Sequence, residues 1–194
     1  MKADDIQLIE MTLAGDKEAF GELVVRYQDR LFGTLVQMLG SIHDARDVGQ
    51  EAFLSAFEKL HTFRKEASFY SWLFRIAYNA AMANRRKLKR RNNSSLDANF
   101  ERTGHEPSDP NPSIDPTHHL RSEENIQQVR HALAQLAPDY RDALLMKEME
   151  GMKYDEIADV LDCPLGTVRS RIHRARCELR EILERLTEHE TEAP

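Results

Sequence analysis

Cysteine is rare in this chain, and motifs that bind metals, phosphates or cofactors are missing from its sequence. Only two of the 194 residues are cysteines, Cys163 and Cys177. This excludes a disulfide framework and makes a cysteine-based zinc site unexpected. The sequence has no glycine-rich phosphate loop, no HExxH motif and no Cys/His ligand spacing. We therefore expect no catalytic residues, no metal and no cofactor, and an enzyme is the least favoured class.

Long apolar runs are also missing. No run approaches the roughly 18 residues that a membrane-spanning helix needs. The N-terminus, Met1-Lys2-Ala3-Asp4-Asp5, is acidic and lacks the apolar core of a signal peptide. Apolar residues make up 41% of the chain and charged residues 31%, which is ordinary for a globular protein. The sequence therefore predicts a cytoplasmic protein with one ordinary domain or two small ones.

Positive charge is in deficit overall but is concentrated in two places. The formal net charge is −6, and residues 1–63 hold six basic and eleven acidic groups. Residues 64–91 hold nine basic groups and one acid, whereas residues 92–163 hold six and fifteen. Residues 164–177 hold four arginines and no acid. Two basic islands in an acidic background favour phosphate-backbone binding, and two solvated helix faces are the alternative.

The pattern of apolar residues predicts an all-α protein. Glycine and proline are scarce before residue 104, and no alternating β-branched run appears. Apolar residues spaced by three and four predict helices over about 4–14, 16–39, 41–60 and 68–91. Ser41 and Ser68 are the expected N-caps of the last two of these helices.

Residues 92–122 have the composition of a flexible linker, because they hold four of the seven prolines and few apolar residues. As a coil this segment would span roughly 30 Å. We therefore expect two small helical domains, residues 1–91 and 123–194, as separate bodies joined by a tether. In the second, helices are expected over about 123–136, 139–150, 154–161 and 165–186.

A helix-turn-helix is predicted from Tyr154 to Arg176, with the turn at residues 162–164. The apolar residues of its second helix alternate by three and four, which fixes one face inward. A helix in the major groove reads base edges from its first turns, and arginine pairs with guanine or with phosphate. An ordinary amphipathic hairpin is the alternative, and His173 could equally be a contact or merely exposed. The expected DNA-facing residues are Thr167, Arg169, Ser170, Arg171, His173 and Arg174.

Aromatic residues accompany the first basic island. Between His61 and Trp72 the sequence places aromatic rings beside a basic helix, which suits the stacking of unpaired bases. Trp72 shares a helical face with core residues, which favours a core role for it. Tyr70 and Phe63 lie off that stripe or in the loop and are better candidates for base contact.

Five segments resemble those of extracytoplasmic-function sigma factors, a subfamily of the sigma-70 family. They cover both expected domains and leave only the linker unmatched. Residues 162–176 and 154–158 resemble region 4 of that family, and the other three resemble region 2. The segments are DCPLGTVRSRIHRAR (162–176), YDEIA (154–158), LVVRYQ (23–28), QEAF (50–53) and FYSWLFRIAYN (69–79).

The resemblance implies an alternative sigma factor that directs core RNA polymerase to promoters. Its C-terminal domain would bind the −35 element and the β flap, and an anti-sigma factor would hold it inactive. It would be a monomer when free, with no small-molecule substrate. Residues implied to dock on the β′ coiled-coil are Asp47, Gln50, Glu51 and Phe53. Residues implied to read the −10 element and the melted strand are His61, Phe63, Arg64, Tyr70, Trp72, Arg75, Asn79, Arg85, Arg86 and Lys87.

The chain departs from the family pattern at three notable positions. Gly49 stands where a β-branched residue is usual and Arg46 where an acid is usual, both at the implied polymerase contact. Lys153 stands where a Ser or Thr N-cap is usual, and losing such a cap costs about 1 kcal/mol. A conventional helix-turn-helix regulator is the main rival reading. However, it would need a sensory N-terminal half, and no ligand-pocket or phosphoacceptor pattern is apparent there.

The basic run at residues 85–91 predicts DNA binding that weakens steeply with salt. Each neutralised phosphate of a single strand contributes roughly −0.7 to the slope of log affinity against log salt. We expect a slope of several units for an oligothymidylate, measured by fluorescence anisotropy over a potassium chloride series. A slope near zero would contradict phosphate binding by this run.

Overall fold

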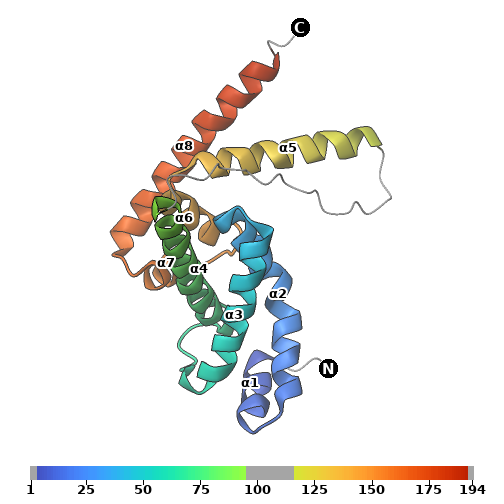
Figure 1. Cartoon of the computed structure of the whole chain (residues 1–194), viewed down its shortest axis with the longest axis vertical. Helices are drawn as coiled ribbons and strands as arrows, with labels where there is room; N and C mark the ends of the chain where they lie inside the picture. The colour runs from blue at the N-terminus through green and yellow to red at the C-terminus, as the bar shows by residue number, and fades with distance from the viewer. Residues whose placement is uncertain (1–3, 95–115, 192–194) are drawn as a thin grey trace.

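Helices provide all the regular structure in the described parts of the chain. The computed structural model describes residues 4–94 and 116–191, and within these ranges there is no strand (Figure 1). The all-α prediction is therefore confirmed. The elements are α1 (Asp5–Leu13), α2 (Lys17–Leu39), α3 (Ile42–Lys59), the 3-10 turn η1 (Leu60–Thr62), α4 (Phe69–Ser94), α5 (Pro116–Gln135), α6 (Pro138–Glu148), α7 (Tyr154–Leu161) and α8 (Leu165–Thr191).

The N-terminal half packs α1 to α4 around one apolar core. On α2 the leucines Leu23, Leu31 and Leu35 are completely buried, because their spacing places them on one stripe of the helix. From α3 the core receives the small residues Ala52 and Ala56. Small side chains allow close approach of neighbouring helices, and α3 indeed lies against both α2 and α4.

Local signals in the sequence begin and end these helices. Asp4 and Gln7 form a reciprocal capping box at the start of α1. The Gln7 N–H donates to Asp4 Oδ1 at 2.8 Å, and the Asp4 N–H donates to Gln7 Oε1 at 3.1 Å. Ser68 accepts a hydrogen bond from the Ser71 N–H at 3.0 Å and caps α4, as its sequence position predicted. After α2, Gly40 adopts a φ of +70°, a left-handed conformation that suits glycine.

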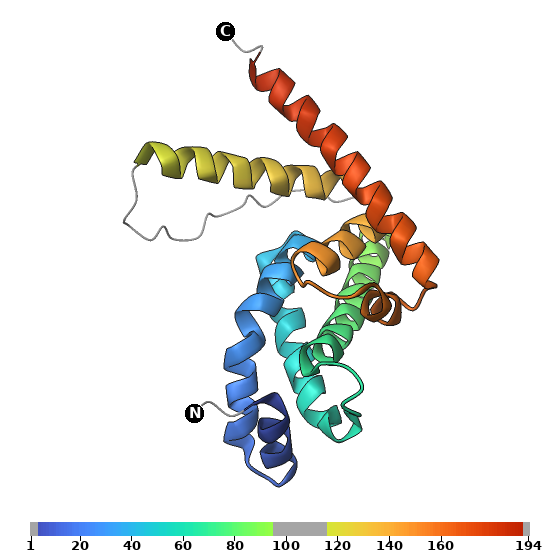
Figure 2. The same cartoon turned by 180° about the vertical axis from the view of Figure 1, so that it is seen from behind.

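The C-terminal half contains the predicted helix-turn-helix. Pro138 is the first residue of α6, one residue before the expected start, and proline suits this position. Ile157 of α7 packs in the core with Val168 and Ile172 of α8. Between the two helices Asp162 has a φ of +48° and ends α7. Figure 2 shows α5 and the C-terminal part of α8 extending away from this body.

The two halves pack against each other, whereas the sequence predicted two separate bodies. In the structure α6 lies against α2, and α7 lies against α4 (Figure 2). The contact is polar: Asp142 and Glu150 of the C-terminal half are both buried, at 1% and 4% exposure. Their main partners, Arg85 and Arg30, lie 57 and 120 residues away along the chain. No local sequence pattern predicts an ion pair between residues so far apart along the chain.

The boundaries of the predicted linker differ from those of the helices. At its start α4 continues to Ser94, and at its end α5 already begins at Pro116. A proline is well tolerated in the first turn of a helix, so Pro116 marks a start and not a break. Residues 95–115, the remainder of the predicted linker, lie outside the described residues.

We expect Gly49→Ala to stabilise the N-terminal half by about 0.5–1 kcal/mol. Gly49 lies inside α3, where glycine costs roughly this much relative to alanine. An added Cβ would meet only Leu35 Cδ1, at an ordinary 3.7 Å. The measurement is the midpoint of urea unfolding followed by circular dichroism. The control Gly40→Ala should instead destabilise, because its φ of +70° strains an alanine. Equal effects of the two substitutions would contradict this account.

Candidate nucleic-acid interface

The outer face of α8 presents the predicted recognition residues to solvent. Its inner face is buried against the rest of the half through Val168, Ile172 and Ala175. This burial fixes the rotation of the helix, so the polar side points outward along its first turns. The predicted residues that are exposed there are Arg169, Ser170, His173 and Arg174.

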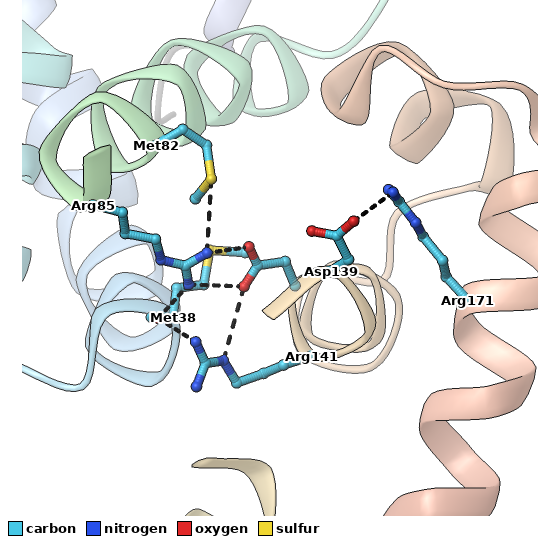
Figure 3. Close-up of polar contacts among 7 residues, drawn as sticks. Met38, Met82, Arg85, Asp139, Arg141 and Arg171 are labelled. Atoms are coloured by element: carbon cyan, nitrogen blue, oxygen red, sulfur yellow. Dashed lines mark hydrogen bonds and ion pairs between the residues drawn. The ribbon is translucent and has the colours of Figure 1, made fainter. Parts of the chain in front are cut away.

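Four of the predicted recognition residues have hydrogen-bond partners within the C-terminal half. The Arg171 Nη2 donates to Asp139 Oδ2 of α6 at 2.6 Å, and Arg171 is half-buried (Figure 3). Thr167 is also half-buried, and its carbonyl accepts from the Ser170 hydroxyl at 2.9 Å. The exposed Arg174 donates to the Tyr140 hydroxyl at 3.1 Å, and this hydrogen bond raises the pKa of the guanidinium. Of the six, Arg169 is therefore the most open to a ligand, and the exposed His173 has only the Cys177 Sγ near its Nε2, at 3.9 Å.

An aromatic cluster lies where the loop after α3 meets the start of α4. The ring centroids of Phe63 and Trp72 are 5.4 Å apart, and those of Phe69 and Trp72 are 5.8 Å apart. Phe69 is buried, whereas Phe63 and Trp72 are half-buried. Both half-buried rings border a pocket of about 350 Å³, together with the exposed Arg64 and Arg75. Rings and cations that share a pocket are a suitable arrangement for unpaired nucleotides.

Tyr70 does not lie off the buried stripe, so the prediction that it is well placed for base contact is wrong for this structure. It is 5% exposed and packs against Tyr27 and Phe74. The Arg30 guanidinium lies 4.0 Å above the centroid of the Tyr70 ring. Burial raises the pKa of the Tyr70 phenol, and the charge of Glu150 raises it further. The periodicity placed Tyr70 beside the stripe, but α2 and the C-terminal half cover that flank.

Most of the residues predicted to follow the melted strand along α4 are exposed, and Arg85 is the exception among them. The predicted residues His61, Asn79, Arg86 and Lys87 are exposed. Arg85 instead crosses to the C-terminal half, where its Nη1 and Nη2 donate to the two carboxylate oxygens of Asp142 at 2.6 and 3.0 Å (Figure 3). Its guanidinium is therefore occupied in this conformation, which sequence analysis did not foresee.

Carboxylates of α7 lie across the aromatic pocket. The Ser71 hydroxyl, at the start of α4, donates to Glu156 Oε1 at 2.7 Å. Glu156 and Asp159 both line the pocket that Arg64 and Arg75 border. The second oxygen of Glu156 accepts from the Lys153 N–H at 2.9 Å and so supports the start of α7. Half of the capping box is thus present, although a lysine occupies the N-cap position.

A second surface, the α2–α3 groove, lies on the far side of α3 from α4. It is an open apolar hollow of about 720 Å³ lined by both helices. Two residues implied to dock on polymerase, Gln50 and Phe53, line it, as do Gly49 and Arg46. The other two, Asp47 and Glu51, are exposed. Asp47 Oδ2 lies 3.2 Å from Nδ1 of His43. Apolar lining residues that sequence analysis did not assign to a site are Phe20, Val24, Phe32, Leu54 and Phe57.

The described ranges contain neither a candidate membrane-spanning helix nor a cluster of possible metal ligands. Between residues 4 and 94, and from 116 to 191, no helix combines the length and apolar character needed to cross a bilayer. Nor do His, Cys, Asp and Glu residues of these ranges gather in threes around a possible metal position.

The chain matches two family models, one for each half. Sigma-70 region 2 matches residues 23–91, and sigma-70 region 4 matches residues 126–179. The chain is 39% identical to the RNA polymerase sigma-H factor of Pseudomonas aeruginosa over 186 residues, covering 94% of this chain and 95% of that protein. It is 41% identical to the ECF RNA polymerase sigma-E factor of Escherichia coli over 177 residues, covering 89% and 90%.

Two solved structures share the arrangement of helices. The sigma factor RpoE in complex with the anti-sigma factor NepR from Bartonella quintana superposes with a TM-score of 0.70 at 25% identity, covering 85% of this chain and 96% of that one. CnrH in complex with the cytosolic domain of CnrY gives 0.65 at 26% identity, covering 91% and 95%. With both regions matched in order and relatives aligned along almost their whole length, the chain belongs to the extracytoplasmic-function group of sigma-70 factors.

Proposed function

We propose that this chain is an alternative sigma factor that binds core RNA polymerase in the cytoplasm and directs it to promoters with particular −35 and −10 elements. Residues 1–91 act as the region 2 domain and residues 123–194 as the region 4 domain, with 92–122 between them. The observation that carries the proposal is the exposed polar face of α8, held outward by a buried apolar face. The chain acts by binding alone and needs no small-molecule substrate.

The first turns of α8 read the −35 element as double-stranded DNA. A helix-turn-helix inserts its second helix into the major groove. Arg169 and His173 are exposed there, one turn apart. Arginine forms a bidentate pair with guanine worth about 1–3 kcal/mol of discrimination. Arg174, already oriented by Tyr140, is suited to a phosphate contact that fixes the register.

The loop after α3 and the outer face of α4 read the −10 element and hold its melted strand. Phe63 and Trp72 are only half-buried and can accept bases by stacking, at about 1–3 kcal/mol per base. Arg64 and Arg75 lie at the same pocket and can neutralise the adjoining phosphates. His61, Asn79, Arg86 and Lys87 extend this exposed face along the strand.

The α2–α3 groove is the docking surface for the β′ coiled-coil of core polymerase. An apolar groove between two helices can receive the apolar side chains that a partner helix exposes on one face. Phe53, Leu54 and Phe57 supply the apolar contact, while Asp47 and Glu51 supply exposed charge beside it. Gly49 also lines the groove and adds no side chain to it. The C-terminal half would contact the β flap.

Control by an anti-sigma factor completes the proposal. One structural neighbour is a sigma factor in complex with an anti-sigma factor, and the other is CnrH in complex with the cytosolic domain of CnrY. An anti-sigma partner that covers the α2–α3 groove would exclude polymerase directly. In the absence of either partner the chain is a monomer.

Reconstituted transcription tests the function as a whole. Purified chain is added to bacterial core RNA polymerase and a library of promoter fragments, and the run-off transcripts are sequenced. Reproducible start sites that share elements near −35 and −10 are expected. Tight binding to DNA without any specific transcript would instead favour a conventional helix-turn-helix regulator.

Arg169→Ala should weaken binding to the selected −35 duplex by about tenfold to a hundredfold, because a bidentate contact to a base is lost. The measurement is fluorescence anisotropy with the duplex found in the run-off experiment. Arg180→Ala is the matched control, since Arg180 is an exposed arginine of the same helix beyond the helix-turn-helix. Equal losses in the two variants would show a general charge effect and not base reading.

Leu54→Asp should reduce affinity for core polymerase by at least about tenfold without unfolding the chain. Leu54 is 67% exposed and lines the α2–α3 groove, so the carboxylate enters the interface and not the core. Val25→Asp, at a 70% exposed position on α2 outside the lining, is the control. Polymerase binding is measured by co-purification and titration. An unchanged affinity for Leu54→Asp would remove this groove from the proposed interface.

A further inference from the structure

We infer that α6 sorts the arginines of α8, aiming one of them at DNA and cancelling the charge of two others. The residues of α6 that do so are Tyr140, Asp139 and Glu148. For the aimed arginine the inference deepens the proposed reading of the −35 element and rests on it. The cancelled charges concern attraction to any duplex, whatever its sequence.

Asp139 cancels the charge of Arg171. Its Oδ2 accepts from Arg171 Nη2 at 2.6 Å (Figure 3). The other terminal nitrogen of Arg171 lies 4.0 Å from Cys163 Sγ in the turn before α8, and only 24% of the arginine side chain is exposed. An ion pair has no net charge, so Arg171 adds little counterion release on a duplex even where it reaches a phosphate. Arg171 therefore stabilises the packing of α8 on α6 and contributes little attraction to DNA.

Glu148 cancels the charge of Arg176 at the other end of α6. Its Oε1 accepts from Arg176 Nη2 at 2.5 Å and from Nε at 3.1 Å. Arg176 follows Arg169 by almost two helical turns and so lies on the same side of α8. Without Glu148 it would extend the cationic edge that begins at Arg169. The ion pair keeps that edge short and limits how many phosphates α8 can neutralise.

Tyr140 acts on Arg174 without cancelling its charge. The Tyr140 hydroxyl accepts from Arg174 Nη1 at 3.1 Å, and Arg174 is exposed. A phenol is an uncharged acceptor, so the guanidinium keeps its full charge for DNA. An arginine that is oriented before it meets DNA loses less conformational freedom on binding. The gain applies only in the register where a phosphate lies in the direction of the guanidinium, so Tyr140 is a positioning residue.

The three acceptors together confine positive charge to the outer face of α8. With about 100° of rotation per residue, Arg171 and Arg176 fall on opposite sides of the buried stripe of Val168 and Ile172. Arg174 lies nearer the outer face. Sequence-independent attraction is thereby kept low while an oriented contact is strengthened. The ratio of specific to non-specific affinity decides whether a site is found among its competitors.

Asp139→Asn tests the cancelled charge on a duplex of scrambled sequence. Fluorescence anisotropy of the labelled duplex with the full chain is followed over a potassium chloride series. The variant should bind about threefold to tenfold more tightly at low salt, and the slope of log affinity against log salt should become more negative by about 0.9. The matched control is Glu181→Gln, which removes an exposed acid farther along α8. Glu148→Gln, which frees Arg176 instead, serves if circular dichroism shows that Asp139→Asn loses helix.

The partner arginine must be present for this effect. Asp139→Asn should change nothing in an Arg171→Ala background. An unchanged slope, an equal gain in the Glu181→Gln control, or the same gain without Arg171 would overturn the inference.

Tyr140→Phe tests the aimed arginine on the −35 duplex selected in the run-off experiment. Affinity should fall about threefold to tenfold, because one hydrogen bond that orients Arg174 is lost. The salt slope should not change, since no charge is removed, and binding to the scrambled duplex should match that of the parent chain. In an Arg174→Ala background the substitution should add no further loss. Equal losses on both duplexes, or a loss that persists without Arg174, would show a structural role and overturn the aiming.

The two tests separate this inference from the proposed function. If no −35 duplex is selected but Asp139→Asn still steepens the slope on the scrambled duplex, the cancelled charge stands, and the −35 reading fails together with the role of Tyr140. If a −35 duplex is bound and neither substitution has its expected effect, the −35 reading stands and the inference fails. Absence of binding to the scrambled duplex by the parent chain and by Asp139→Asn alike would also refute the inference.

Discussion

The buried carboxylate of Asp142 determines how the two halves of the chain are held together. It lies between Arg85 of α4 and Arg141 of α6, and both arginines also reach the Met38 carbonyl. The last four carbonyls of a helix have no partner within it, and cations are favoured at that end. The C-terminus of α2, which has no basic residue in its own last turn, is thus completed by arginines from two other helices. Three helices meet at this point, and the rest of the interface follows from their orientation.

Because the two halves pack against each other, the two proposed DNA-reading surfaces differ in how accessible they are to DNA. The outer face of α8 points away from the interface between the two halves and is exposed to solvent. The aromatic pocket beside α4 is bordered by α7 and by its carboxylates. A duplex could therefore meet α8 without any rearrangement, whereas a single strand entering the aromatic pocket would meet the carboxylates of Glu156 and Asp159 at its border.

Local chemistry accounts for what could be predicted from the sequence. The Ser68 cap and the inward face of α8 depend on residues a few positions apart, and both are present as predicted. The environments of Tyr70 and Arg85 could not be predicted, because their partners are distant in sequence. Periodicity also identifies which helix face is apolar without saying whether another helix covers it. Phe57 belongs to such a stripe and yet remains partly exposed in the α2–α3 groove.

Glu156 uses its two oxygens for different purposes. One supports the first turn of α7 through the Lys153 N–H, and the other accepts the Ser71 hydroxyl of the N-terminal half. The start of α7 and its contact with the N-terminal half therefore depend on one side chain. A replacement without a side-chain acceptor would loosen the docked arrangement and fray the helix together, so neither property can be tuned there independently of the other.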